Sequence, residues 1–277
     1  MAASAETLKC EDYKPIADDW TIVIRKRTNQ KRKLPKLKPS KQQEQQTQWA
    51  PTDIETSPEK ELKLMQKIKT SIEKLEKSQF FTAFLNQIRT PEASQHFENI
   101  TESKRKLKMV IYGIGSIESY ESPRLQLSLA ILMKKNLEWI GDMEVFDPII
   151  SLTESKVMEE LGVRVLSVNE QGKREVVDPI LFFMPHCEVE LYDNLLKTNW
   201  RHELLNKIIL LGNSFDKYEQ QHRLVSKNRD LDDSRKHLLA IKRFTKEFEI
   251  RTISDDFFRA FHGSSWHFFS VDCDIDL

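Results

Sequence analysis

Short, nearly uninterrupted apolar runs alternate with helix-like segments from Leu107 onward. Five of these runs read MVIYGIGS, MEVFDP, VRVLSV, ILFFMPHC and KIILLGNSF, and apolar residues with helical spacing follow most of them. A strand that is apolar on both sides needs cover on both sides, which is typical of a parallel sheet between two helix layers. The sequence therefore predicts an α/β fold, a Rossmann-like three-layer sandwich with a mainly parallel sheet. We also expect a last strand at Trp266–Val271 and a helix over residues 233–248.

The chain before these runs divides into two parts. Residues 1–50 hold 11 Lys and Arg against 6 Asp and Glu, and the block Arg25–Lys41 concentrates this positive charge. Because like charges interrupted by prolines cannot bury themselves, we expect residues 1–55 to form a disordered basic arm. Ser57 and Pro58 are typical of a helix start, and apolar residues spaced by three and four follow them. We therefore expect residues 56–100 to form a helical segment packed on a core domain of residues 101–277.

Cysteine usage and hydropathy indicate the compartment. Cys10, Cys187 and Cys273 are scattered and odd in number, which disfavours a disulfide framework and favours a reducing environment. The beginning of the sequence lacks the apolar core of a signal peptide, and no apolar run approaches the length of a membrane span. We expect a soluble intracellular protein that is not associated with a membrane.

Polar residues close four of the apolar runs. In an open α/β sheet, ligands bind beyond the carboxyl ends of the strands, where the strand order reverses. The loops that end these runs should therefore meet at one edge. The sequence predicts a ligand crevice there, lined by Gly113, Gly115, Ser116, Asp147, His186, Asn213 and Ser214.

The first of these loops, GIGS, resembles a phosphate-binding turn but is incomplete. Glu118 occupies the place of the third glycine in the dinucleotide fingerprint, and Ile117 breaks the alternating-glycine variant found in methyltransferases. The alternative is a tight turn that needs positive backbone dihedrals. Asp147 has two interpretations as well. It accepts hydrogen bonds from a ribose or a polar partner, or it caps the turn that Pro148 begins.

His186 and Cys187 stand side by side at the end of an apolar run. Adjacent side chains diverge, which disfavours a nucleophilic pair, and two neighbouring ligands do not make a zinc site. We predict no catalytic residue and no metal ligand. Cys187 is interpreted as a packing residue and His186 as a polar residue facing a ligand. Asn213 and Ser214 either pin loops or hold a polar ligand. A later polar cluster, residues 262–265, forms no catalytic pattern.

Several of these motifs occur together in a known family. YGIGS leading into RLQLSLAILM, then VFDP, ILFFMPHCEVELYDNLLKTNW and IILLGNSF follow in this order, and the arm carries DDWTIVIRKR. The pattern resembles the SENSITIVITY TO RED LIGHT REDUCED family, in its plant-type form, over roughly residues 106–215. The resemblance implies a regulator of phytochrome B-linked red-light signalling and of circadian clock input. It further implies protein partners in these processes, a location in nucleus and cytoplasm, and no established catalysis.

Two function classes remain open at this point. The first is a non-enzymatic regulator whose α/β domain binds a partner or a ligand. The second is an enzyme of Rossmann-like descent that binds a nucleotide or an S-adenosylmethionine-type cofactor, although the sequence does not identify the cofactor. The basic segment Arg25–Lys33 is predicted to bind a nuclear import receptor. Sequence-specific binding of nucleic acid is not expected, because the sequence contains no recognisable reading motif.

Overall fold

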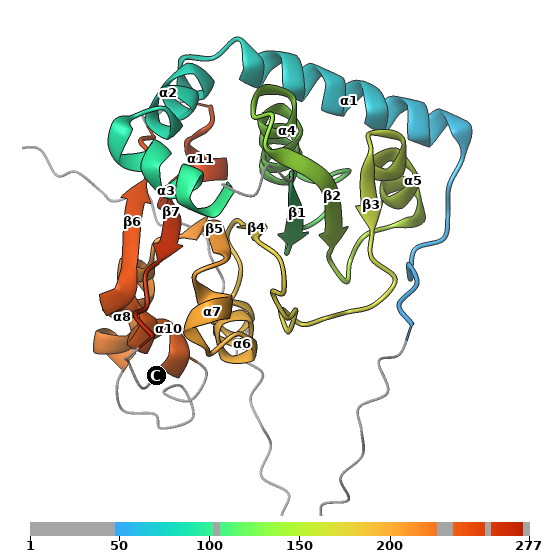
Figure 1. The fold of residues 1–277 in the computed structure, drawn as a ribbon. Helices are drawn as coiled ribbons and strands as arrows, with labels where there is room; N and C mark the ends of the chain where they lie inside the picture. Colours follow the sequence, from blue (N-terminus) through green and yellow to red (C-terminus); the bar gives the residue numbers. More distant parts are fainter. Residues whose placement is uncertain (1–47, 102–105, 226–234, 253–255, 274–277) are drawn as a thin grey trace, which may run out of the picture. The chain divides into compact units, whose positions relative to one another are not determined.

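The computed structural model describes residues 48–101, 106–225, 235–252 and 256–273. Along the chain (Figure 1) the elements are α1 (Pro58–Glu76), α2 (Gln79–Ile88), α3 (Pro91–Thr101), β1 (Leu107–Tyr112), α4 (Glu121–Asn136), β2 (Ile140–Phe146), α5 (Leu152–Glu160), β3 (Val163–Val165), β4 (Ile180–Met184), α6 (Val189–Thr198), α7 (His202–Leu205), β5 (Ile208–Asn213), α8 (Phe215–Val225), α10 (Lys236–Ile241), a 3-10 turn (Lys242–Phe244), β6 (Thr245–Glu249), α11 (Phe258–Phe261) and β7 (Ser264–Phe269).

The strands form one sheet of mainly parallel strands. Their order is β3-β2-β1-β4-β5-β7-β6, in which the first five are parallel and β7 runs antiparallel to both neighbours. The chain first builds outward from β1 to β3 and then returns to place β4 on the other side of β1. The strand order therefore reverses between β1 and β4, as in Rossmann-like sheets. The predicted fold class is confirmed.

Helices cover both faces of the sheet, because the central strands carry apolar residues on both sides. In β1, Met109 and Ile111 point to one face, which we call the first face, and Val110 and Tyr112 point to the second face. Apolar residues of α1 to α5 and α11 pack on the first face, whereas those of α6, α8 and α10 pack on the second. This arrangement is the predicted three-layer sandwich.

The helical segment begins as predicted. The Ser57 side chain accepts a hydrogen bond from the Lys60 amide, and Pro58 occupies the first turn of α1. The buried residues of α1, among them Leu64 and Ile68, belong to the first-face core, and α1 packs on α4 and α5. The segment forms three helices. The second of them, α2, begins after Ser78, whose hydroxyl accepts a hydrogen bond from the Phe81 amide.

Two predicted elements near the end of the chain differ from the structure. The helix expected over residues 233–248 is wrong beyond Ile241, because residues 245–249 form β6 and pair antiparallel with β7. Lys and Glu favour a helix, but pairing with β7 overrides this propensity, and β6 lies at the edge of the sheet, where charged side chains are common. The last strand spans Ser264–Phe269, two residues earlier than expected.

Residues 166–179, all of them described, connect β3 to β4 without a helix (Figure 1). We call them the crossing segment, because they lie over β1 and β2 on the second face. Leu166 and Val176 belong to the core of that face together with Val110 and Phe146. The Asn199 side chain holds the segment through the Val176 amide and the Arg174 carbonyl, each at 2.8 Å.

The end of the predicted arm also contacts this region. The Trp49 amide donates to the Ser167 carbonyl at 2.6 Å, and the Trp49 ring meets the Phe146 ring edge-on with centroids 5.3 Å apart. Residues 1–47 of the predicted arm, including Arg25–Lys33, lie outside the described residues.

Candidate functional site

The loops that follow β1, β2, β4 and β5 begin at the carboxyl edge of the sheet. The loops after β1 and β4 lie on either side of the point where the strand order reverses. The tight turn predicted for GIGS is present, since Gly113 and Gly115 have φ angles of +65° and +76°. His186 is a non-glycine residue in the same left-handed region, with φ +54°. The predicted residues differ in what their polar atoms contact.

Asp147 holds two backbone turns together. One carboxylate oxygen accepts from the Gly115 amide at 2.8 Å, and the other accepts from the Ile149 amide at 3.0 Å. The side chain is buried, and both of its oxygens have a protein donor. This is the turn-capping role that the sequence offered as the alternative for Asp147.

A second buried carboxylate, Glu154 at the start of α5, closes the remainder of the GIGS loop. Its Oε1 atom accepts from the Ser116 hydroxyl at 2.7 Å and from the Glu118 amide at 2.8 Å. Its Oε2 atom accepts from the Ser151 amide in a reciprocal capping box. Two protein carboxylates therefore use amide groups of the loop that would otherwise be free to bind a phosphate. Sequence reasoning missed Glu154, although Ser151 and Glu154 have the spacing of a capping box.

Cys187 fills the space at the switch point. Its thiol donates to the Tyr112 carbonyl at 3.2 Å, and a Cβ atom added at Gly113 would lie 2.6 Å from its Sγ. Burial raises the pKa of the Cys187 thiol, and the charge of Asp147 raises it further, which disfavours the nucleophilic thiolate. The packing interpretation of Cys187 agrees with this environment.

His186 and Asn213 join the loops after β4 and β5. The His186 amide donates to Asn213 Oδ1 at 2.9 Å, and His186 Nε2 lies 3.1 Å from the Ala260 carbonyl. Burial lowers the pKa of the His186 imidazole, although the hydrogen bond to Ala260 opposes this effect. Asn213 Nδ2 donates to the Tyr218 hydroxyl at 2.7 Å, and the Ser214 amide donates to the Gly263 carbonyl at 2.9 Å.

The seven predicted residues thus form two groups that their own hydrogen bonds tie into the loops. A cavity of about 170 Å³ remains at this edge, lined by Tyr112, Gly113, Phe146, Pro148, Asn169, Gln171, Gly172 and Leu191. This volume is below the roughly 300 Å³ at which small-molecule sites begin. Of the seven, only Gly113 lines the cavity.

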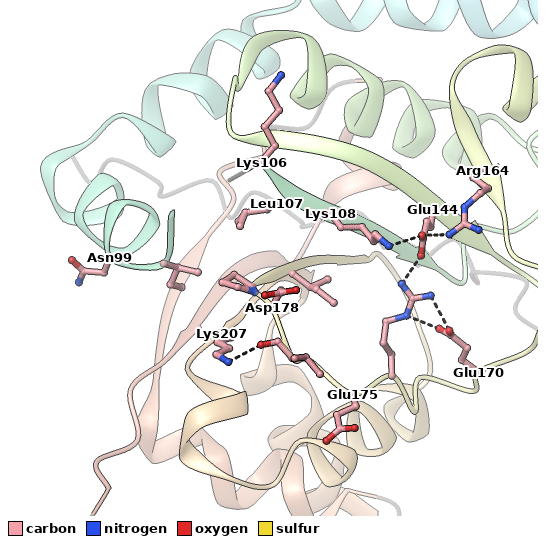
Figure 2. A pocket seen from close by; sticks show the side chains of 15 residues that line it. Asn99, Lys106, Leu107, Lys108, Glu144, Arg164, Glu170, Glu175, Asp178 and Lys207 are labelled. Atoms are coloured by element: carbon pink, nitrogen blue, oxygen red, sulfur yellow. Dashed lines mark hydrogen bonds and ion pairs between the residues drawn. The ribbon is translucent and has the colours of Figure 1, made fainter. Parts of the chain in front are cut away.

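A larger hollow, which we call the charged groove, begins at the amino ends of β1 and β4 and extends over the second face beside the crossing segment. Its volume is about 800 Å³, and Figure 2 shows its lining. The charged lining residues come from β1 to β3, from the crossing segment and from the positions just before β1 and β5: Lys106, Lys108, Glu144, Arg164, Glu170, Arg174, Glu175, Asp178 and Lys207.

Glu144 is the centre of this charged lining. Lys108 and Arg164 both contact its Oε1 atom, and Arg174 contacts Oε2. Burial raises the pKa of Glu144, but hydrogen bonds from these three cations outweigh it and lower the pKa to about 2. Glu170 accepts from both Arg174 and the Tyr112 hydroxyl. Sequence reasoning missed this site, although a glutamate inside the apolar run MEVF was a visible signal.

The part of the chain that the structure describes contains neither a cluster of metal-ligating side chains nor a helix able to cross a membrane. Within it, no three His, Cys, Asp or Glu side chains converge on a site that could hold a metal ion. None of the described helices combines the length and apolar character of a membrane span.

Comparison with known proteins identifies the family. Residues 93–268 match the model of the SRR1 domain. Protein SENSITIVITY TO RED LIGHT REDUCED 1 of Arabidopsis thaliana is 54% identical over 230 residues, which are 83% of this chain and 82% of that protein. SRR1-like protein of Mus musculus is 40% identical over 138 residues, which are 47% of this chain and 53% of that protein.

Similarity to solved structures is much weaker. MtNAS in complex with MTA and tNA has 15% identity and a TM-score of 0.39, covering 76% of this chain and 70% of that one. SAH-bound methyltransferase PaMTH1 of Podospora anserina has 11% identity and a TM-score of 0.37, covering 79% and 91%. Neither likeness carries an argument about function. The domain match and the extent of identity to the Arabidopsis protein show that this chain belongs to the SRR1 family.

Proposed function

We propose that this protein is a regulator of red-light signalling that acts by binding other proteins and not by catalysis. The observation that carries the proposal is the 54% identity to Protein SENSITIVITY TO RED LIGHT REDUCED 1, which extends over 83% of this chain. The finer parts of the proposal are a link to phytochrome B, input to the circadian clock and a location in both nucleus and cytoplasm.

The carboxyl edge of the sheet supports a non-catalytic role. An enzyme of this fold class needs free donors and an open crevice at that edge. Here Asp147 and Glu154 accept from the loop amides, and Cys187 fills the space over Gly113. The loops are thereby held as a fixed surface, which suits recognition of a partner.

Complementation tests the proposal. The chain is expressed in Arabidopsis that lacks the relative, and stem elongation of seedlings is measured in continuous red light and in darkness. We expect the chain to restore the red-light response and to leave growth in darkness unchanged. The period of a clock-driven reporter in the same plants tests the clock component. Failure to restore the response, with the chain accumulating to the level of the native relative, would refute the proposal.

The second candidate is an enzyme that binds a nucleotide or an S-adenosylmethionine-type cofactor. The cavity of about 170 Å³ beside Gly113 favours it, because it lies at the carboxyl ends of β1 and β2. A thermal-shift measurement with S-adenosylmethionine and with ATP distinguishes the candidates. A ligand at 100 times its Kd adds about 2.7 kcal/mol to the free energy of unfolding, which raises Tm visibly. We expect no shift, and a saturable shift would favour the enzyme.

A further inference from the structure

The charged groove has a floor made by three adjacent strands. Lys108 of β1, Glu144 of β2 and Arg164 of β3 point to the second face, and Glu144 pairs with Arg164 in the sheet register. Figure 2 shows Lys108 and Arg164 approaching Glu144 from opposite sides. In a three-layer sandwich a helix normally covers this part of a parallel sheet. Here the crossing segment contains no helix and leaves the side chains of Lys108 and Arg164 accessible, while Glu144 is buried between them.

Positive charge exceeds negative charge in this row. Three cations, Lys108, Arg164 and Arg174, surround the single carboxylate of Glu144. The carboxylate of Glu170 balances Arg174, with which it forms a second ion pair at 2.8 Å. The two carboxylates therefore leave one positive charge uncompensated. The excess is the same over the whole groove, whose lining contains five cations and four carboxylates.

The uncompensated charge faces the open side of the groove. The Glu144 side chain is 2% exposed, whereas those of Arg164 and Lys108 are 64% and 42% exposed. A guanidinium group has five N–H donors, and the contact with Glu144 involves only the Nη2 atom of Arg164. The exposed cations can therefore bind a second anion without giving up Glu144.

We propose that the charged groove binds a small organic phosphate. Its phosphate lies on Arg164 and Lys108, because the planar guanidinium fork matches phosphate oxygens and the ammonium group adds a point charge. Its apolar part lies on Val177 and Ile180, which also line the groove. A volume of about 800 Å³ is within the range of small-molecule sites. This site is separate from the carboxyl edge and goes beyond the proposed function.

Calorimetric titration of the full chain tests the proposal, with inorganic phosphate and phenyl phosphate as probes. Phenyl phosphate is expected to bind with a Kd of about 1 mM or tighter, and inorganic phosphate more weakly because it lacks the apolar part. Arg164→Gln is expected to weaken phenyl phosphate binding at least about tenfold. Arg164→Lys should give an intermediate loss, since it keeps the charge and removes the fork.

The matched control is Lys156→Gln, which removes an exposed lysine that pairs with Glu61 in the first-face layer. It should leave phenyl phosphate binding unchanged. If Arg164→Gln lowers the Tm of the chain, Lys108→Gln provides an independent test with the same expected weakening. Absence of saturable binding to the wild-type chain overturns the proposal. Equal affinity of the wild-type chain and both groove variants overturns it as well. If both probes bind with equal affinity, the groove recognises only the phosphate group, and the proposal of an organic phosphate is wrong.

Discussion

The sulfur atom of Cys187 lies directly over Gly113, so that a methyl group at position 113 would be 2.6 Å from it. The two residues lie in the loops that follow the neighbouring strands β1 and β4, at the point where the strand order reverses. Contact between them closes the place where a Rossmann-like sheet usually opens toward a ligand.

This contact predicts the cost of an alanine at Gly113. Gly113→Ala and Gly162→Ala both introduce a side chain at a left-handed φ, but at Gly162 nothing lies within 4 Å of the added carbon. We expect Gly162→Ala to lower the free energy of unfolding by about 1–2 kcal/mol. Gly113→Ala should cost about 1–3 kcal/mol more, because the methyl group overlaps the sulfur. Urea unfolding measures the loss in both variants. Equal losses would mean that the Cys187 side chain moves aside without cost.

Glu154 should be essential for holding the GIGS loop. Glu154→Gln places an amide donor where two amides and a hydroxyl now donate to the carboxylate. We expect a loss of about 1–3 kcal/mol in the free energy of unfolding. The control is Glu160→Gln, an exposed position of the same helix, which should change it by less than about 0.5 kcal/mol. Similar losses in both variants would contradict the role of Glu154.

His267 should make the stability depend on pH. It is fully buried, with Nδ1 3.3 Å from the Leu210 carbonyl and Nε2 3.6 Å from Glu247. Burial lowers the pKa of His267 to about 4, despite the opposing charge of Glu247. Between about pH 6.5 and 4 the unfolded chain therefore binds a proton that the folded chain does not.

The free energy of unfolding should accordingly fall as the pH is lowered through this window. His267→Gln removes the titrating group and should flatten that part of the profile. Urea unfolding at a series of pH values from 7 to 4, for wild type and variant, measures the difference. If the profiles of wild type and variant are parallel, His267 has the same protonation state in the folded and the unfolded chain.

The basic arm should direct nuclear entry. Replacing Arg25–Arg27 and Lys31–Lys33 with alanine removes both clusters that an import receptor would bind. We expect the nuclear fraction of a fluorescently tagged chain to fall. A variant with alanine at Lys36, Lys38 and Lys41 removes charge from the same arm outside the clusters and should behave as wild type. If the cluster variant enters the nucleus normally, import does not depend on Arg25–Lys33.

The fold was predictable because its signals are local. Runs such as ILFFM are apolar on both sides, and only a sheet between two helix layers buries both. The segment Thr245–Glu249 could not be assigned in this way, because its strand exists only through pairing with β7, which comes later in the chain. Residues at the carboxyl edge were located by a topological rule, but that rule does not say whether neighbouring loops leave their donors free.

The charged groove depends on relationships that the sequence does not display. Arg174 meets Glu144 across 30 residues, and the groove exists because the crossing segment contains no helix. A glutamate in an apolar strand signals a buried ion pair, yet its partners are found only when the strands are placed side by side.

The contact of Trp49 with Ser167 has a consequence during synthesis. The Trp49 amide bonds to a residue about 120 positions later, and α1 packs on α4 and α5, which also follow it. At about 5–20 residues per second, Trp49 waits about 6–24 s on the ribosome before its acceptor is made. For most of this time α4 and α5, which cover the apolar side of α1, are incomplete. The apolar side of α1 therefore stays exposed on the nascent chain until α5 has emerged.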